Sequence, residues 1–130
     1  MAILADRNIE GQALILWGIL AAEGWVELCS LKLVIFAEVG LHFETSDREV
    51  WRFAQHNGMI LLTDNRNMKG KDSLEQTIRE ENTKTSLPVL TIGNVNRIVK
   101  KSYREQCASR LVEIILDLEN YLGSGRIFIP

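Results

Sequence analysis

Three aspartates stand where the chain is expected to pass from one element of secondary structure to the next. Asp6 and Asp64 each follow a short apolar run that reads as a buried strand, and Asp47 lies beside Ser46 at the expected start of a helix. In an open α/β sheet the carboxyl ends of parallel strands line the crevice where ligands bind. Carboxylates gathered there repel one another unless a cation lies between them, and Mg²⁺ or Mn²⁺ prefers such oxygen ligands. These residues therefore predict a divalent-metal site that acts on a phosphate ester.

Asn65, Asn67 and Asp72 are further candidate metal ligands. The two asparagines come directly after Asp64. An amide oxygen can bind a hard cation but adds no charge, which lowers metal affinity and the capacity to activate a water. Asp72 lies at the expected start of another helix, where it could restore a carboxylate. We expect either a variant site or a degenerate one, with Asp64, or Asn65 in its stead, facing the same cleft as the other two aspartates.

Each of these side chains also has a purely structural explanation. Asp47 in a first helical turn would stabilise the helix macrodipole, and Asp72 would be an ordinary N-cap. Asp64 and the asparagines after it could shape a turn, because Asx side chains bond to nearby backbone amides. Asp6 is the clearest functional candidate, because a carboxylate that ends an apolar strand is costly to bury unless it is paired.

Apolar runs predict the strands. Residues 25–28 could form a second strand, 31–36 also read as a strand by residue type, and 37–40 suggest a short helix or turn. The other runs predict strands over 2–5, 59–63, 88–92 and 126–129, the last at a sheet edge.

Helical spacing and capping signals predict the helices. Asn8 would cap a helix over 9–23, and Ser46 opens a capping box with Glu49 for a helix that ends at Asn57 and Gly58. The same capping logic predicts a helix from 72–75 to about 82, and Asn94 would cap the last helical region. The residues expected on buried helix faces are Ala13, Leu14, Trp17, Leu20, Ala21, Val50, Phe53, Ala54, Tyr103, Cys107, Leu111, Ile114, Ile115 and Leu118.

The alternation of strands and helices calls for a mainly parallel sheet covered on both faces, which is a three-layer α/β sandwich. With 130 residues, 46% of them hydrophobic, the chain has enough apolar material for one domain over residues 1–130. A net charge of −2 gives no general attraction to nucleic acid. Cys29 and Cys107 lack metal-ligand spacing and fit small core residues in a reduced setting. Without a signal peptide or a membrane span in this sequence, we expect a cytoplasmic protein.

Two segments resemble the PIN-like nuclease domains. Ile3-Leu4-Ala5-Asp6-Arg7-Asn8 is similar to that family's opening motif, two hydrophobic residues followed by x-Asp-x-Asn. The stretch 45–50, followed by Ala54, Asn57-Gly58 and 60–63, resembles the family's second acidic helix and its fourth core strand. The resemblance covers about the first two-thirds of the chain. It departs from the usual Thr-x-Asp-x-Asp after that strand, where Asn65 and Asn67 stand and Asp64 is displaced by one position.

The resemblance implies a fold and an activity. PIN-like domains gather three or four carboxylates around Mg²⁺ or Mn²⁺ on a short parallel sheet, many cleave RNA, and several are toxins neutralised by an antitoxin protein. It implies a ribonuclease with Asp6, Asp47 and Asp64 as catalytic residues, and a homodimer is possible because related domains often pair through helices. The basic and polar residues expected to hold the substrate near the crevice are Arg7, Asn8, Arg66, Lys69 and Lys71.

Two other classes of protein fit parts of the pattern. A catalytically degenerate PIN-like domain would bind RNA or a protein without cleavage. A response-regulator-like receiver also carries acidic residues at strand ends, but it needs an acidic pair after the first strand and a Lys after the fifth. Here the first strand is followed by Asp6 alone, and 88–92 is followed by Gly93 and Asn94. The receiver is therefore disfavoured.

Overall fold

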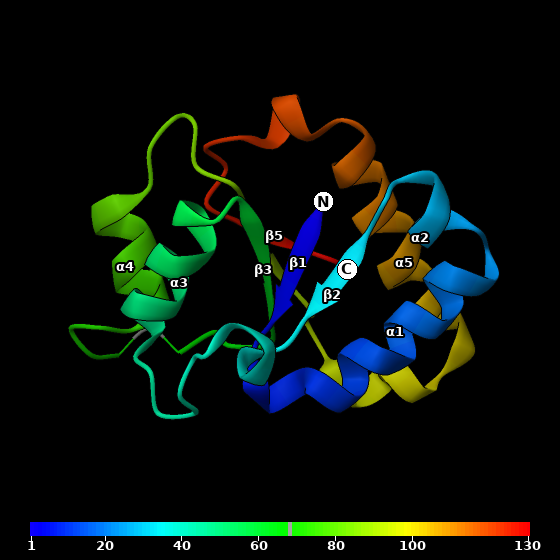
Figure 1. The fold of residues 1–130 in the computed structure, drawn as a ribbon, viewed down its shortest axis with the longest axis horizontal. Helices are drawn as coiled ribbons and strands as arrows, with labels where there is room; N and C mark the ends of the chain where they lie inside the picture. Colours follow the sequence, from blue (N-terminus) through cyan, green and yellow to red (C-terminus); the bar gives the residue numbers. More distant parts are fainter. Residues whose placement is uncertain (68) are drawn as a thin grey trace.

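The computed structural model describes residues 1–67 and 69–130 and has a parallel sheet at its centre (Figure 1). The sheet order is β2-β1-β3-β4-β5, and every neighbouring pair is parallel. This order is that of flavodoxin-like doubly wound sheets. The strands are β1 (Ala2–Ala5), β2 (Lys32–Val34), β3 (Met59–Thr63), β4 (Val89–Thr91) and β5 (Arg126–Phe128). The prediction of a mainly parallel α/β sheet, with its last strand at an edge, is confirmed.

Helices cover both faces of the sheet (Figure 1). The α-helices are α1 (Glu10–Ala22), α2 (Trp25–Leu28), α3 (Asp47–His56), α4 (Leu74–Glu81) and α5 (Lys101–Leu116). Short 3₁₀ turns are η1 (Arg7–Ile9), η2 (Phe36–Val39), η3 (Val95–Val99) and η4 (Leu118–Tyr121). The right-handed crossover rule for parallel strands explains why connections that pass to opposite sides of β1 place helices on opposite faces.

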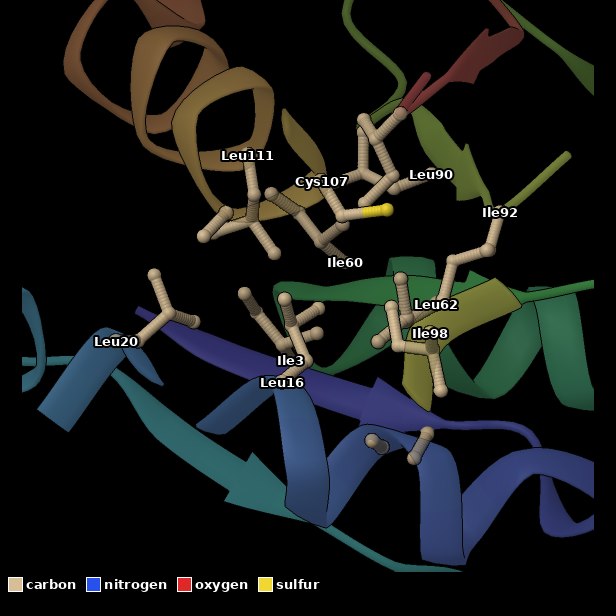
Figure 2. Close-up of a cluster of buried hydrophobic side chains, with 14 of the residues drawn as sticks. Ile3, Leu16, Leu20, Ile60, Leu62, Leu90, Ile92, Ile98, Cys107 and Leu111 are labelled. Atoms are coloured by element: carbon tan, nitrogen blue, oxygen red, sulfur yellow. The ribbon is translucent and has the colours of Figure 1, made fainter. Parts of the chain in front are cut away.

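Each face of the sheet has its own hydrophobic core. Side chains of β1, β3 and β4 pack with α1, η3 and α5 on one face, and Figure 2 shows Ile3, Leu16, Leu62 and Leu111 converging there. On the other face, alternate strand residues such as Leu4 pack against α3 and α4. This division follows from the strand period of two, by which successive side chains point to opposite faces.

The predicted strand over 25–28 is wrong, because these residues form the helical turn α2. Gly24 adopts φ +84° after α1, and the N–H of Leu28 donates to its carbonyl oxygen at 3.0 Å. The left-handed glycine ends α1, as it does in many helices, and turns the chain so that Trp25 and Val26 pack against the core. The strand that follows α2 is β2, and it lies within residues 31–36, which also read as a strand from the sequence. The 3₁₀ turn η2 agrees with the helix or turn predicted over 37–40.

One of the four predicted caps is confirmed, because the hydroxyl of Ser46 accepts the Glu49 N–H at 3.2 Å. The cap predicted at Asp72 lies one residue later, where the hydroxyl of Ser73 accepts the Gln76 N–H at 3.1 Å. The caps predicted at Asn8 and Asn94 are wrong. Asn8 lies inside the turn η1, and Asn94 precedes η3 without a capping hydrogen bond from its side chain. In both places the chain makes a 3₁₀ turn before its α-helix, so the α-helix starts later than its cap signal indicates.

The buried face of α1 also differs from the expected one. Ala13, Leu16 and Leu20 are buried, whereas Leu14 is 63% exposed and Ala21 is exposed. The helix is apolar on nearly all sides, so spacing alone cannot indicate which side meets the sheet. On α5 the predicted residues Tyr103, Cys107, Leu111 and Ile114 are buried, and Ile115 is half-buried. Within the described residues, no helix has the length and apolar character needed to cross a membrane.

The two cysteines have different environments. Cys107 is fully buried on α5, where burial raises the pKa of its thiol to about 12. Cys29 is half-buried, so only one of the two is a true core residue. A thiol with so high a pKa is almost wholly protonated near neutral pH and therefore a poor nucleophile.

Candidate functional site

A pocket of about 460 Å³ opens where β1 and β3 end, and we name it the Asp6 pocket. Asp6 follows β1, Asn65 lies two residues after β3, and Asp47 begins α3. All three line this pocket. In the sheet order β2-β1-β3, the chain passes to opposite sides of β1, so the carboxyl ends of β1 and β3 flank the topological switch point. Such a point is the preferred place for a ligand in an open α/β sheet.

Asp6 is held from two directions. Its N–H donates to the Leu62 carbonyl at 2.9 Å, which continues the pairing of β1 with β3, and its Oδ2 accepts the Thr63 hydroxyl at 2.7 Å. Burial is the main cause that raises the pKa of the Asp6 carboxyl above its ordinary value, and the charges of Asp47 and Asp64 act in the same direction. The hydrogen bond from Thr63 opposes this rise. An ionised Asp6 is therefore unfavourable here without a compensating positive charge.

Asp47 links three segments of the structure. Its Oδ2 accepts the amide of Asn65 at 2.9 Å and the N–H of Leu74, the first residue of α4, at 3.2 Å. As the first residue of α3 it also lies at the positive end of that helix. Asp47 therefore has the structural role that its place in the first helical turn indicated. Its carboxylate also lines the Asp6 pocket.

Asn65 turns its amide nitrogen towards Asp47 and its amide oxygen into its own loop. The oxygen accepts the N–H of Asn67 at 3.0 Å, and the Asn67 oxygen in turn accepts the N–H of Lys69 at 3.0 Å. These are the Asx turns expected as the structural alternative. The oxygen of Asn65 is turned into the loop and its nitrogen towards Asp47, so Asn65 meets the Asp47 carboxylate as a hydrogen-bond donor and not beside it as a metal ligand.

Replacing Asn65 with Asp should lower stability without metal and increase the response to metal. The new carboxylate would face Asp47 in place of a donor, at a cost of about 1–3 kcal/mol. A bound cation would relieve the repulsion and stabilise the fold by mass action. Thermal unfolding in EDTA, Mg²⁺ and Mn²⁺ measures both effects. The matched control is Asn67→Asp, which keeps the acceptor for Lys69 and lies outside the pocket. Equal unfolding temperatures of wild type and Asn65→Asp in all three buffers would contradict the proposed contact.

The structure does not place Asp64 and Asp72 in the Asp6 pocket. Asp64 lines a separate pocket of about 290 Å³ with Arg66, because residues 64 and 65 leave the strand on opposite sides. Asp72 accepts the guanidinium of Arg48 at 3.0 Å and lies one residue before Ser73, which is the N-cap of α4. Asn65, the alternative to Asp64, is therefore the residue after β3 that lines the Asp6 pocket.

Arg48 explains the position of the 69–73 segment. It also bonds to the carboxylates of Glu80 and Glu81 and donates to the Lys71 carbonyl at 2.6 Å. Its side chain is only 13% exposed. Asp72 is thus part of an ion-pair network that ties α3 to α4, and this role explains the residue without a metal.

The predicted substrate-binding residues are divided among several places. Arg7 and Asn8 line the Asp6 pocket, and Arg66 lies at the separate pocket beside Asp64. Lys69 and Lys71 are exposed on the loop that precedes α4. The structure therefore brings one guanidinium, that of Arg7, to the same pocket as Asp6 and Asp47.

Several residues of the site escaped prediction. Phe43, Glu44 and Thr45 line the Asp6 pocket from the turn before α3, and Thr63 orients Asp6. Thr63 could have been found, because it is the last residue of a predicted strand and directly precedes Asp64. The turn residues carry no recognisable spacing.

Arg126 at the start of β5 also escaped prediction. Its Nη1 donates to the Asn65 carbonyl and to the Thr91 hydroxyl, both at 2.7 Å, and its Nε pairs with Glu75 at 2.9 Å. Its side chain is 9% exposed. No sequence signal connects a residue of the last strand with the loop after β3.

The donor chemistry of the pocket suits a cation held by two carboxylates. Across residues 1–67 and 69–130, no three His, Cys, Asp or Glu side chains are grouped as a protein-only metal site requires. Mg²⁺ in phosphoryl-transfer sites commonly keeps several waters and is bound by one or two carboxylates together with substrate phosphates. Asp6 and Asp47 satisfy that smaller requirement, because both carboxylates line the Asp6 pocket.

The comparisons with known proteins give no relative from which a role could be transferred. No protein-family model matches the chain, and neither the curated proteins nor the solved structures contain a match. The geometry of the Asp6 pocket and the sequence motifs around it are therefore the basis for assigning a function.

Proposed function

We propose that this chain is a PIN-like, Mg²⁺- or Mn²⁺-dependent ribonuclease and that the Asp6 pocket is its active site. The observation that carries the proposal is that Asp6 and Asp47, which are 41 positions apart, line one pocket at the β1/β3 switch point. The burial that disfavours the charge of Asp6 adds support, because a cation would offset it.

Asp6 and Asp47 would hold the cation. When bound, it would lower the pKa of a water and offset the charge that develops on the phosphate oxygens. Thr63 orients the Asp6 carboxylate through its hydroxyl, and Asn65 orients Asp47 through its amide. Arg7 would hold a phosphate of the substrate, which fixes the position of the strand without reading its sequence.

The test is the cleavage of single-stranded RNA in Mg²⁺, Mn²⁺ or EDTA. We expect slow hydrolysis that is faster with Mn²⁺, because Mg²⁺ demands a nearly ideal octahedron and sheds its waters reluctantly. Asp47→Asn should reduce cleavage by at least about 10–100-fold, the loss that changes around metal ligands typically cause. The matched control is Glu49→Gln, two residues along α3, whose side chain is exposed. Equal cleavage by wild type and Asp47→Asn would identify a contaminant and refute the assignment.

A second candidate function is a binding module without catalysis. The hydrogen bond from Asn65 to Asp47 favours it, because that amide already satisfies part of the negative charge that would attract a cation. In this case RNA or a protein partner would bind, no ion would raise the unfolding temperature, and Asn65→Asp would not generate cleavage. The toxin role, the antitoxin partner and the homodimer implied by the family resemblance stay predictions.

A further inference from the structure

An exposed aromatic stack lies at the rim of the Asp6 pocket. The rings of His42 and Phe43 are stacked with their centroids 4.4 Å apart and their planes at 29°. The guanidinium carbon of Arg7 lies over the Phe43 ring, 5.3 Å from its centroid. Phe43 is nevertheless 56% exposed. A large apolar side chain left in water is informative here because it is joined to a polar pocket.

The turn that carries the stack is held by its own hydrogen bonds. The Nδ1 of His42 accepts the N–H of Glu44 at 3.1 Å. The His42 carbonyl accepts both the hydroxyl of Thr45 at 2.7 Å and its N–H at 3.0 Å. Because the aromatic residues are positioned before any ligand arrives, binding costs less conformational entropy than ordering a loose loop would.

The stack and the carboxylates share one continuous surface. Phe43 and Arg7 line the Asp6 pocket together with Asp6 and Asp47. They also line an adjoining pocket of about 450 Å³, to which His42 contributes. A ligand on the stack would therefore reach the carboxylates directly.

We propose that the stack of His42, Phe43 and Arg7 is a platform against which an unpaired base stacks while the strand's backbone enters the Asp6 pocket. This inference rests on the proposed function and deepens it, because it names the residues that would hold an unpaired base of the substrate beside the active site. Unpaired bases stack on aromatic rings and on Arg guanidinium planes, whereas the paired bases of a duplex are covered by their neighbours. Every base has a π-face, so the platform reads no sequence.

The surroundings favour nucleic acid over a peptide as the occupant. Arg7 combines a stacking plane with a positive charge for phosphate, and the two carboxylates would hold a cation that a phosphate can share. A peptide that used Phe43 as an apolar anchor would bring no phosphate to share the cation with the two carboxylates.

The test is the binding of a short, fluorescein-labelled single-stranded RNA, followed by anisotropy at low salt in EDTA so that no cleavage occurs. Base stacking contributes enough that Phe43→Ala should weaken binding by about 5–100-fold. Phe43→Trp should retain it, and Phe43→Leu should not. RNA with abasic positions should bind wild type as weakly as intact RNA binds Phe43→Ala. Duplex RNA should show no difference between wild type and Phe43→Ala.

The matched control is Phe128→Ala. Phe128 is 45% exposed on the edge strand β5 and does not line the Asp6 pocket. Unchanged RNA binding by Phe43→Ala, or no measurable binding by wild type, would overturn the platform. RNA binding that depends on Phe43 but is never followed by cleavage would support the platform and refute the ribonuclease. Equal cleavage rates of wild type and Phe43→Ala would support the ribonuclease and refute the platform.

Discussion

Replacing Asp6 with Asn should stop RNA cleavage and at the same time make the metal-free protein more stable. The cleavage rate should fall by more than about 100-fold, because Asp6 would bind the cation directly and even changes to residues behind metal ligands cost about 10–100-fold. Stability at pH 7 should rise because burial and the charges of Asp47 and Asp64 disfavour an ionised Asp6. The neutral Asn can still accept the Thr63 hydroxyl. Cleavage assays and thermal unfolding in EDTA measure the two effects.

The stability difference should depend on pH with a defined sign. A carboxyl whose folded pKa is raised stabilises the protein fully below its unfolded pKa, and this contribution is lost as pH rises through the folded pKa. The wild type should therefore lose stability relative to Asp6→Asn from about the ordinary value of 3.8 upward, and the difference should level off above the raised pKa. Unfolding free energies of both proteins across this range give the profile.

Added metal should reverse the order of stability. A cation that binds only the folded wild type stabilises it by mass action, and Asp6→Asn should gain little. Glu49→Gln is the control, because it removes an exposed carboxylate from the first turn of α3 and should lower stability slightly in every buffer. A loss of stability in Asp6→Asn across the whole pH range would show that the carboxylate is structural.

Replacing Arg126 with Ala should destabilise the protein by about 3 kcal/mol, which lowers the unfolding temperature by about 10 °C in a domain of this size. The guanidinium is buried and joins β5 to Glu75 of α4 and to the Asn65 carbonyl. Its removal leaves these groups and the Thr91 hydroxyl without their donor. Cleavage should fall as well, because the loop that positions Asn65 against Asp47 loses its anchor. Urea unfolding and the cleavage assay measure the two losses.

The matched control for Arg126 is Arg79→Ala on α4. Arg79 is exposed, and an exposed substitution usually changes stability by less than about 0.5 kcal/mol. Arg126→Lys should recover only part of the loss, because a single ammonium cannot reproduce the fixed fork of donors that reaches Glu75, Asn65 and Thr91 together. Similar unfolding curves for Arg126→Ala and Arg79→Ala would contradict the anchoring role.

Local signals were sufficient for most of the sheet and for two helix starts. β1 and β3 coincide with their predicted ranges, and Ser46 caps α3 as predicted. These features depend on residues only a few positions apart, so the sequence contains all the necessary information. The local signals failed where two structures compete over a short stretch. Residues 25–28 are β-prone by type, but a left-handed Gly24 and packing beside α1 select a helical turn.

The sequence by itself determined that the chain alternates strands and helices and that acidic or amide side chains follow β1 and β3. It could not determine which of these side chains meet. Asn65 joins Asp47 and Asp64 does not, because one residue of register at the end of β3 reverses the face to which a side chain points. Arg126 meets Asn65, and Phe43 meets Arg7, only after segments far apart in the chain pack together. Contacts between distant segments depend on the twist of the sheet and on packing, and the local spacing of residues specifies neither.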